Sequence, residues 1–174
     1  KKLSLNLGLR YSVYLGLGES TQRIYASNSP ITDATLQETN EFGKNEVYKT
    51  YQGLEYRFSG RYFLNPELSL KASFNRSFQF IHRLSNNTSA SPTDAWKLSD
   101  TNIKPQEAIQ ASLGIFKNFD VNAFELSLEG YYKKYSNVLD YKVGANFLLN
   151  ERIETAVLQG PGKSYGLELK LGLL

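Results

Sequence analysis

The first segment of the chain alternates apolar and polar side chains with a period of two. Every odd position from residue 3 to residue 17 is apolar or aromatic, and the even positions are mostly polar or glycine. A period of two places successive side chains on opposite faces of a β-strand, whereas a helix would scatter these leucines around its circumference. The segment therefore predicts one long strand with an apolar face and a polar face.

Five further segments repeat this alternation. Together with the first they predict an all-β chain of about six long strands: residues 3–17, 54–64, 68–74, 109–115, 124–132 and 165–173.

The connections between these strands are of two kinds. Short turns are expected at 63–68, around Asn65-Pro66, and at 117–122, while long polar stretches cover 18–49, 83–104 and 142–152. Short and long connections alternate strictly along the chain. That rhythm is typical of an antiparallel up-and-down meander with turns at one end and long loops at the other.

The apolar face meets either lipid or a protein core. The chain has no run of about 18 apolar residues, so no membrane-spanning helix is expected. The apolar row in residues 3–17 exceeds the roughly 9–11 residues that a tilted strand needs to cross a bilayer. Strand length and loop asymmetry thus favour a transmembrane β-barrel. Because ordinary membrane barrels have about eight strands or more, six strands indicate part of a barrel.

Two alternatives to this reading stay open. If two strands lie unrecognised in the long loops, the chain is a complete eight-stranded barrel with a structural or adhesin role. If the apolar row faces a core, the chain is a soluble β-domain that binds a ligand.

Composition excludes several other classes. The net charge of +3 is small and the basic residues are dispersed, which gives nucleic-acid binding no support. The chain has no cysteine and one histidine, so we expect no metal site. No Ser/His/Asp set is visible, so we expect neither an enzyme nor a catalytic residue, and no cofactor.

The closing stretch, "LQGPGKSYGLELKLGLL", raises and then removes one enzymatic possibility. Gly162, Lys163 and Ser164 match the end of a phosphate-binding loop, but Val157 stands where the motif needs its first glycine. The residues that follow alternate with a period of two instead of forming a helix. We therefore interpret 160–162 as a bulge or bend in one long strand, with Lys163 and Ser164 in the wall.

An ordered set of short motifs carries a family resemblance. The order is Asn-Pro-Glu-Leu in a turn, Phe-Asn-Arg in a strand, Lys-Pro-Gln before the next strand, and then Glu-Gly-Tyr-Tyr-Lys-Lys. In these segments the chain resembles the barrel of TonB-dependent outer-membrane transporters of the Bacteroidetes type. The resembling residues are 56–86, 102–119, 124–151 and 162–171, half of the chain.

The resemblance implies a barrel of about 22 strands with a plug domain in its lumen. Such proteins lie in the bacterial outer membrane and import scarce, bulky nutrients such as iron chelates, cobalamin or glycans. The implied partners are outer-membrane lipid, the rest of the barrel with its plug, and the TonB complex through parts outside this segment. We expect residues 1–174 to be a single barrel segment with no plug domain and no TonB box.

The resemblance also suggests where ligand contacts lie. The only histidine and the only tryptophan bracket a loop that it makes extracellular, and His82, Arg83 and Trp96 are the candidate ligand contacts. An aromatic ring beside a cation suits a ligand ring or an anionic chelate. The alternative is that Trp96 packs the loop against the barrel rim.

The polar faces carry a second set of candidates. In the barrel interpretation these residues line the lumen, where opposite charges hold a plug; in the alternative they form a solvated face. The residues are Glu55, Arg57, Arg61, Lys71, Glu125 and Glu129.

Overall fold

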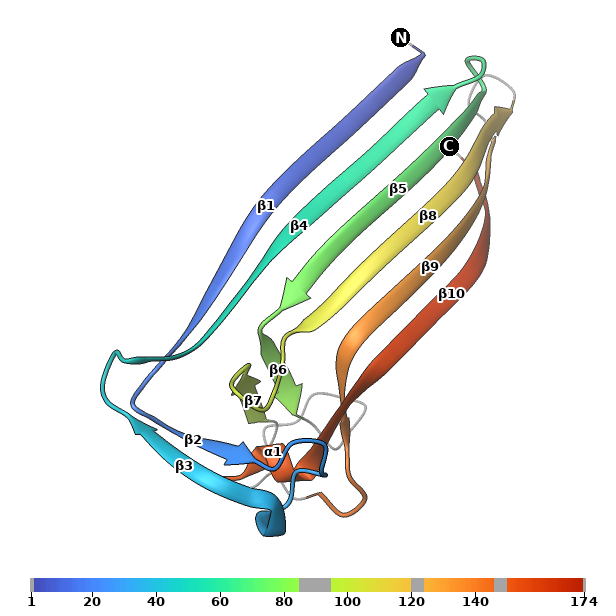
Figure 1. The fold of residues 1–174 in the computed structure, drawn as a ribbon. Helices are drawn as coiled ribbons and strands as arrows, with labels where there is room; N and C mark the ends of the chain where they lie inside the picture. The colour runs from blue at the N-terminus through green and yellow to red at the C-terminus, as the bar shows by residue number, and fades with distance from the viewer. Residues whose placement is uncertain (1, 85–94, 120–123, 146–149, 174) are drawn as a thin grey trace.

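The fold is an open, curved, six-stranded antiparallel sheet with smaller elements gathered at one end (Figure 1). The computed structural model describes residues 2–84, 95–119, 124–145 and 150–173. The neighbouring strands of the main sheet, in order, are β1 (Leu3–Leu17), β4 (Val47–Phe63), β5 (Leu68–Gln79), β8 (Gln106–Phe119), β9 (Phe124–Tyr141) and β10 (Val157–Leu173).

The predicted alternation produces two chemically different faces. Strand register places Leu7 opposite Phe58, Phe58 opposite Phe74, and the same line continues to Tyr132 and Tyr165. The apolar side chains are not covered by a second layer: Leu7 is 69% exposed. We call this surface the apolar face, and the opposite surface the polar face.

Long and short connections lie at opposite ends of the sheet, as the sequence predicts. The turn from β4 to β5 spans only residues 64–67, and the Asn65 side-chain oxygen accepts hydrogen bonds from the backbone N–H groups of Glu67 (2.9 Å) and Leu68 (2.7 Å). An asparagine suits this position because its side-chain oxygen accepts the backbone hydrogen bonds that close the turn. The expected turn at 117–122 falls partly outside the described residues.

The long-loop end contains structure that the sequence analysis missed. The connections between the predicted strands contain two hairpins and two single helical turns, most of them within the expected polar loops. These elements are β2 (Ser20–Tyr25), η1 (Asp33–Thr35), β3 (Leu36–Phe42), β6 (Ile81–Leu84), β7 (Ala95–Leu98) and α1 (Ile153–Ala156).

These additional strands do not convert the chain into a complete barrel. Strand β2 pairs only with β3, and β6 only with β7, so neither hairpin joins the main sheet. Among the described residues, β1 and β10 remain the two edges of an open sheet. The eight-stranded alternative is therefore wrong for this chain.

The small hydrophobic core also lies at the long-loop end. Leu84, Ile103, Ala156 and Val157 are buried together there, and none of the exposed leucines of β1 belongs to this core. A soluble sheet would bury its apolar face instead, so the soluble alternative does not fit. No helix in the described parts of the chain is long and apolar enough to cross a membrane.

The interruption predicted at 160–162 is a bulge. Gly160 lies opposite Val138, but Gly162 lies opposite Tyr135, so the extra residue belongs to β9 and not to β10. Asn137, in the bulged segment, has a φ of 58°. Asparagine tolerates that left-handed conformation better than most residues. Strand β10 then runs on with Lys163 and Ser164 in the sheet, as expected.

Candidate functional site

The ligand-contact candidates lie on the β6–β7 hairpin at the long-loop end. Arg83 is directly opposite Trp96, and Ile81 is opposite Leu98, so these four side chains share one face of the hairpin. Trp96 is 64% exposed, and Ile81, Arg83 and Leu98 are also exposed. The alternative in which Trp96 packs the loop against a barrel rim stays a prediction. We call this surface the Arg83–Trp96 face.

His82 lies on the other face of the same hairpin. Its side chain is only 3% exposed, and its Nε2 atom is 3.1 Å from the hydroxyl of Ser99. Burial lowers the pKa of His82 below its ordinary value, and the nearby charge of Asp100 only partly opposes this. His82 is thus buried on one face of the hairpin, while Arg83 and Trp96 are exposed on the other.

The hairpin is anchored to the polar face of the main sheet. The Tyr14 hydroxyl donates to the backbone carbonyl of Ser99 (2.7 Å), and the Tyr51 hydroxyl donates to that of Asp100 (2.8 Å). Tyr14 and Tyr51 lie opposite each other on β1 and β4, on the same face as Glu55. These two hydrogen bonds hold the Arg83–Trp96 face at the long-loop end of the sheet, next to the polar face.

Asp100 organises the segment between these anchors. Its Oδ1 atom accepts hydrogen bonds of 2.8 Å from the backbone N–H groups of Asn102 and Ile103, and Oδ2 lies 2.6 Å from the Lys97 ammonium. The carboxylate is only 4% exposed but fully partnered. A buried, partnered carboxylate fixes a loop; it is not poised for chemistry.

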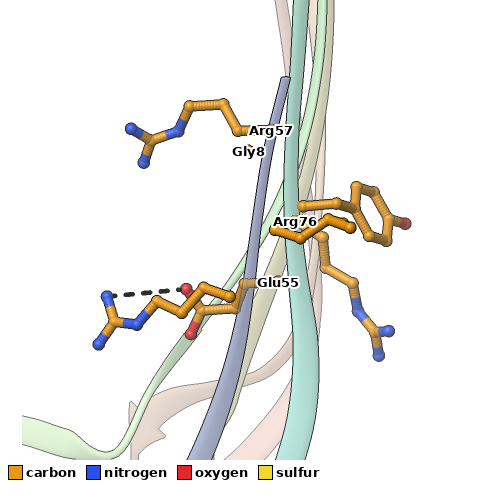
Figure 2. Close-up of a pocket in the computed structure, with 7 residues that line it drawn as sticks. Gly8, Glu55, Arg57 and Arg76 are labelled. Carbon is orange, nitrogen blue, oxygen red and sulfur yellow. Dashed lines mark ion pairs between the residues drawn. The ribbon is translucent and has the colours of Figure 1, made fainter. Parts of the chain in front are cut away.

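The six polar-face candidates do share one face. Register places Arg61 opposite Lys71, Lys71 opposite Gly114, and Gly114 opposite Glu129. Figure 2 shows Glu55 and Arg57 extending from one side of the sheet while Arg76 extends from the other. The structure thus separates the polar-face charges from Arg76, which the sequence analysis did not single out.

The charges on the polar face differ in how they are held. Glu55 accepts a hydrogen bond from the Ser12 hydroxyl (2.8 Å) and lies 4.0 Å from the Arg10 guanidinium (Figure 2). Arg61 donates to the Ser69 hydroxyl (2.9 Å), and its guanidinium lies 5.3 Å from the centre of the Phe116 ring. Glu55 and Arg61 are therefore fixed in orientation.

A shallow depression on the polar face brings several of these groups together. Asn6, Arg61, Lys71, Phe116 and Glu125 line it. It combines two cations, one carboxylate and an aromatic ring on an open surface instead of in an enclosed pocket.

Comparison with known proteins gives one match. A family model described as "TonB dependent receptor-like, beta-barrel" matches residues 1–173. No curated protein and no solved structure matches the chain.

Proposed function

The chain belongs to the TonB-dependent receptor-like β-barrel family, and from that premise we propose that it forms a wall segment of a receptor that imports a scarce, bulky nutrient. The family consists of outer-membrane transporters and not of enzymes. The single observation that carries the proposal is the sheet itself. Its apolar face is exposed along every strand, and its polar face carries the fixed charges.

The two open edges support a larger barrel. An unpaired strand edge exposes backbone N–H and C=O groups, which lipid cannot satisfy. We propose that β1 and β10 pair with further strands of the same barrel. The polar face then lines a lumen, and the depression around Arg61 and Lys71 contacts a plug domain.

The Arg83–Trp96 face supports a ligand contact at the extracellular opening. Four neighbouring side chains there combine a guanidinium with apolar and aromatic area, and all are exposed. Such a surface suits an anionic or ring-bearing nutrient. By the resemblance to Bacteroidetes-type receptors, the proposed substrates are iron chelates, cobalamin or glycans.

The test uses the complete receptor in cells that lack the native gene. Growth is measured with a single iron chelate, cobalamin or glycan as the limiting nutrient, with and without a functional TonB. We expect growth on one nutrient class to require both the receptor and TonB. Growth on every nutrient without the receptor would contradict transport.

A binding measurement then tests the Arg83–Trp96 face. Trp96→Ala in the complete receptor is expected to weaken affinity for the identified nutrient by about fivefold or more, the usual scale for a stacked ring. Leu64→Ala, at the short-turn end, is the matched control. Unchanged affinity in Trp96→Ala would remove Trp96 from the site.

A further inference from the structure

A row of charged side chains lies on the apolar face, close to the long-loop end of the sheet. The strand register places them on this face, because Arg76 lies opposite Tyr56 and Lys134 lies opposite Ile109. In each of these strands, the residues of the apolar face that lie nearer the short-turn end are mostly apolar. The charged residues on the four strands are Arg76 on β5, Glu107 on β8, Lys134 on β9 and Lys163 on β10.

On the short-turn side of the two lysines each strand carries a tyrosine in the same outward row. Tyr132 lies opposite Tyr165, and two residues nearer the long-loop end Lys134 lies opposite Lys163. An apolar band, an aromatic row and then cations is the arrangement that membrane proteins show from the bilayer interior to its headgroups. By this arrangement we expect the two lysines at headgroup depth, where a long aliphatic stem allows an ammonium to reach the phosphates.

The two ends of this charged row are balanced differently. Arg76 Nε lies 2.7 Å from Glu107 Oε1, so these two charges neutralise each other. Lys134 and Lys163 are both exposed, and no ion pair between described residues involves either of them. Like charges directly opposite on neighbouring strands are destabilising, so an external anion between them would be stabilised.

We propose that Lys134 and Lys163 form a clamp for the phosphate of a lipid headgroup in the leaflet on the long-loop side. Each ammonium supplies up to three hydrogen-bond donors to the phosphate oxygens, and the charges are complementary. The adjoining apolar rows, with Leu167 79% exposed, receive the acyl chains of the same lipid. The orientation of the leaflets rests on the proposed function.

The experiment compares two double variants of the complete receptor purified in a neutral detergent. K134Q/K163Q removes the clamp. K133Q/K170Q removes the same charge from the same two strands, but Lys133 and Lys170 lie opposite Ser164 and Ser127 on the polar face. Native mass spectrometry measures binding of lipid A with two phosphates and of its dephosphorylated form.

The expected result is a selective loss. Near-surface lysines attract anionic lipid, so K134Q/K163Q should weaken binding of phosphorylated lipid A by about tenfold or more. K133Q/K170Q should stay within about twofold of the unchanged receptor, and dephosphorylated lipid A should not distinguish the two double variants.

Three outcomes would overturn the clamp. Equal binding by both double variants in receptor extracted from the outer membrane overturns it and leaves the transport proposal intact. Displacement of lipid A by millimolar inorganic pyrophosphate, with pyrophosphate bound equally well alone, assigns the site to free phosphate and not to a lipid. Recovery of the receptor as a soluble protein overturns both proposals.

Discussion

The hydroxyl of Tyr25 donates a hydrogen bond of 2.9 Å to Oε1 of Glu154, and so joins the β2–β3 hairpin to helix α1 before β10. These residues come from loops at opposite edges of the sheet, which Figure 1 shows meeting below its long-loop end. Arg23 lies 3.4 Å from the same carboxylate oxygen. Burial and this hydrogen bond raise the pKa of Tyr25 to about 12, so the hydroxyl remains a donor at neutral pH.

The first prediction concerns this buried carboxylate. Glu154 is only 4% exposed, so Glu154→Ala leaves the Tyr25 hydroxyl without its acceptor and leaves the Arg23 guanidinium with only the backbone carbonyl of Glu151, 3.0 Å away, and no counter-charge. Breaking a buried pair from one side costs about 3 kcal/mol. We expect hydrogen exchange of β2 and β3 in the complete receptor to accelerate by about a hundredfold.

The control is a second ion pair between the same two loops. Arg152 lies 2.6 Å from Asp33, but both side chains are exposed, and exposed pairs contribute little. Arg152→Ala should leave exchange of the hairpin nearly unchanged. If both variants accelerated exchange equally, burial of Glu154 would not be the reason for its effect.

The second prediction is a pH dependence of the β6–β7 hairpin. The pKa of His82 is lowered in the folded protein from an ordinary value of 6.5, so folding favours the neutral ring. Its contribution is fully present above pH 6.5 and is lost as the pH falls through the lowered pKa, because the opened state binds the proton first. After correction for intrinsic exchange measured from pH 7 to pH 5, opening of residues 81–84 should increase as the pH falls below 6.5, with a change of at most about tenfold per pH unit.

His82→Gln separates this effect from other titrations. The glutamine retains a polar partner for Ser99 but cannot ionise, so its exchange should not change over that interval. His82 is the only histidine of the chain, and carboxylates titrate mainly below pH 5. An unchanged pH dependence in the variant would assign it to another group.

The third prediction concerns a ring that covers a glycine on the polar face. A Cβ atom at Gly166 would lie 2.9 Å from the Tyr131 ring, which is closer than real contacts allow. Gly166→Ala must displace that ring, and overpacking of this kind costs about 1–3 kcal/mol. The urea midpoint of the receptor in detergent should fall accordingly.

Gly160→Ala in the same strand is the matched control, because a Cβ atom there meets nothing within 4 Å. Its midpoint should barely change. Equal midpoints for the two variants would mean that the Tyr131 ring moves aside freely.

These contacts show which parts of the molecule the sequence could predict. The alternation in β1 was sufficient for the strand, its two faces and its place in an up-and-down sheet, because a period of two is a local property. The β2–β3 hairpin was missed because its strands are short and polar, and because a side chain 129 residues away holds Tyr25. Local patterns contain no signal for such a contact.

The candidate sites divide in the same way. Arg83 and Trp96 were singled out by residue type, but only the β6–β7 register places them opposite each other, and only the fold buries His82 between them and the sheet. Lys134 was passed over and Lys163 was interpreted only as a wall residue, because each ends an apolar alternation in its own strand. Their juxtaposition depends on the register across a bulge, which no single strand reveals.

The last prediction tests which face of the sheet meets lipid. Leu7 lies midway along the outward row between Leu3 and Tyr11 and is 69% exposed, while the neighbouring Asn6 lies on the polar face. An arginine facing lipid near the bilayer midplane costs about 2–4 kcal/mol, whereas one facing a wet lumen is solvated and its repulsions are screened by salt. We expect Leu7→Arg to lower both the urea midpoint and the amount of receptor in the outer membrane, and Asn6→Arg, which adds a cation beside Arg61 and Lys71 in the proposed lumen, to lower them less. Because the two variants add the same charge one residue apart, equal losses would mean that the apolar face is not in lipid, and a greater loss for Asn6→Arg would place the polar face there instead.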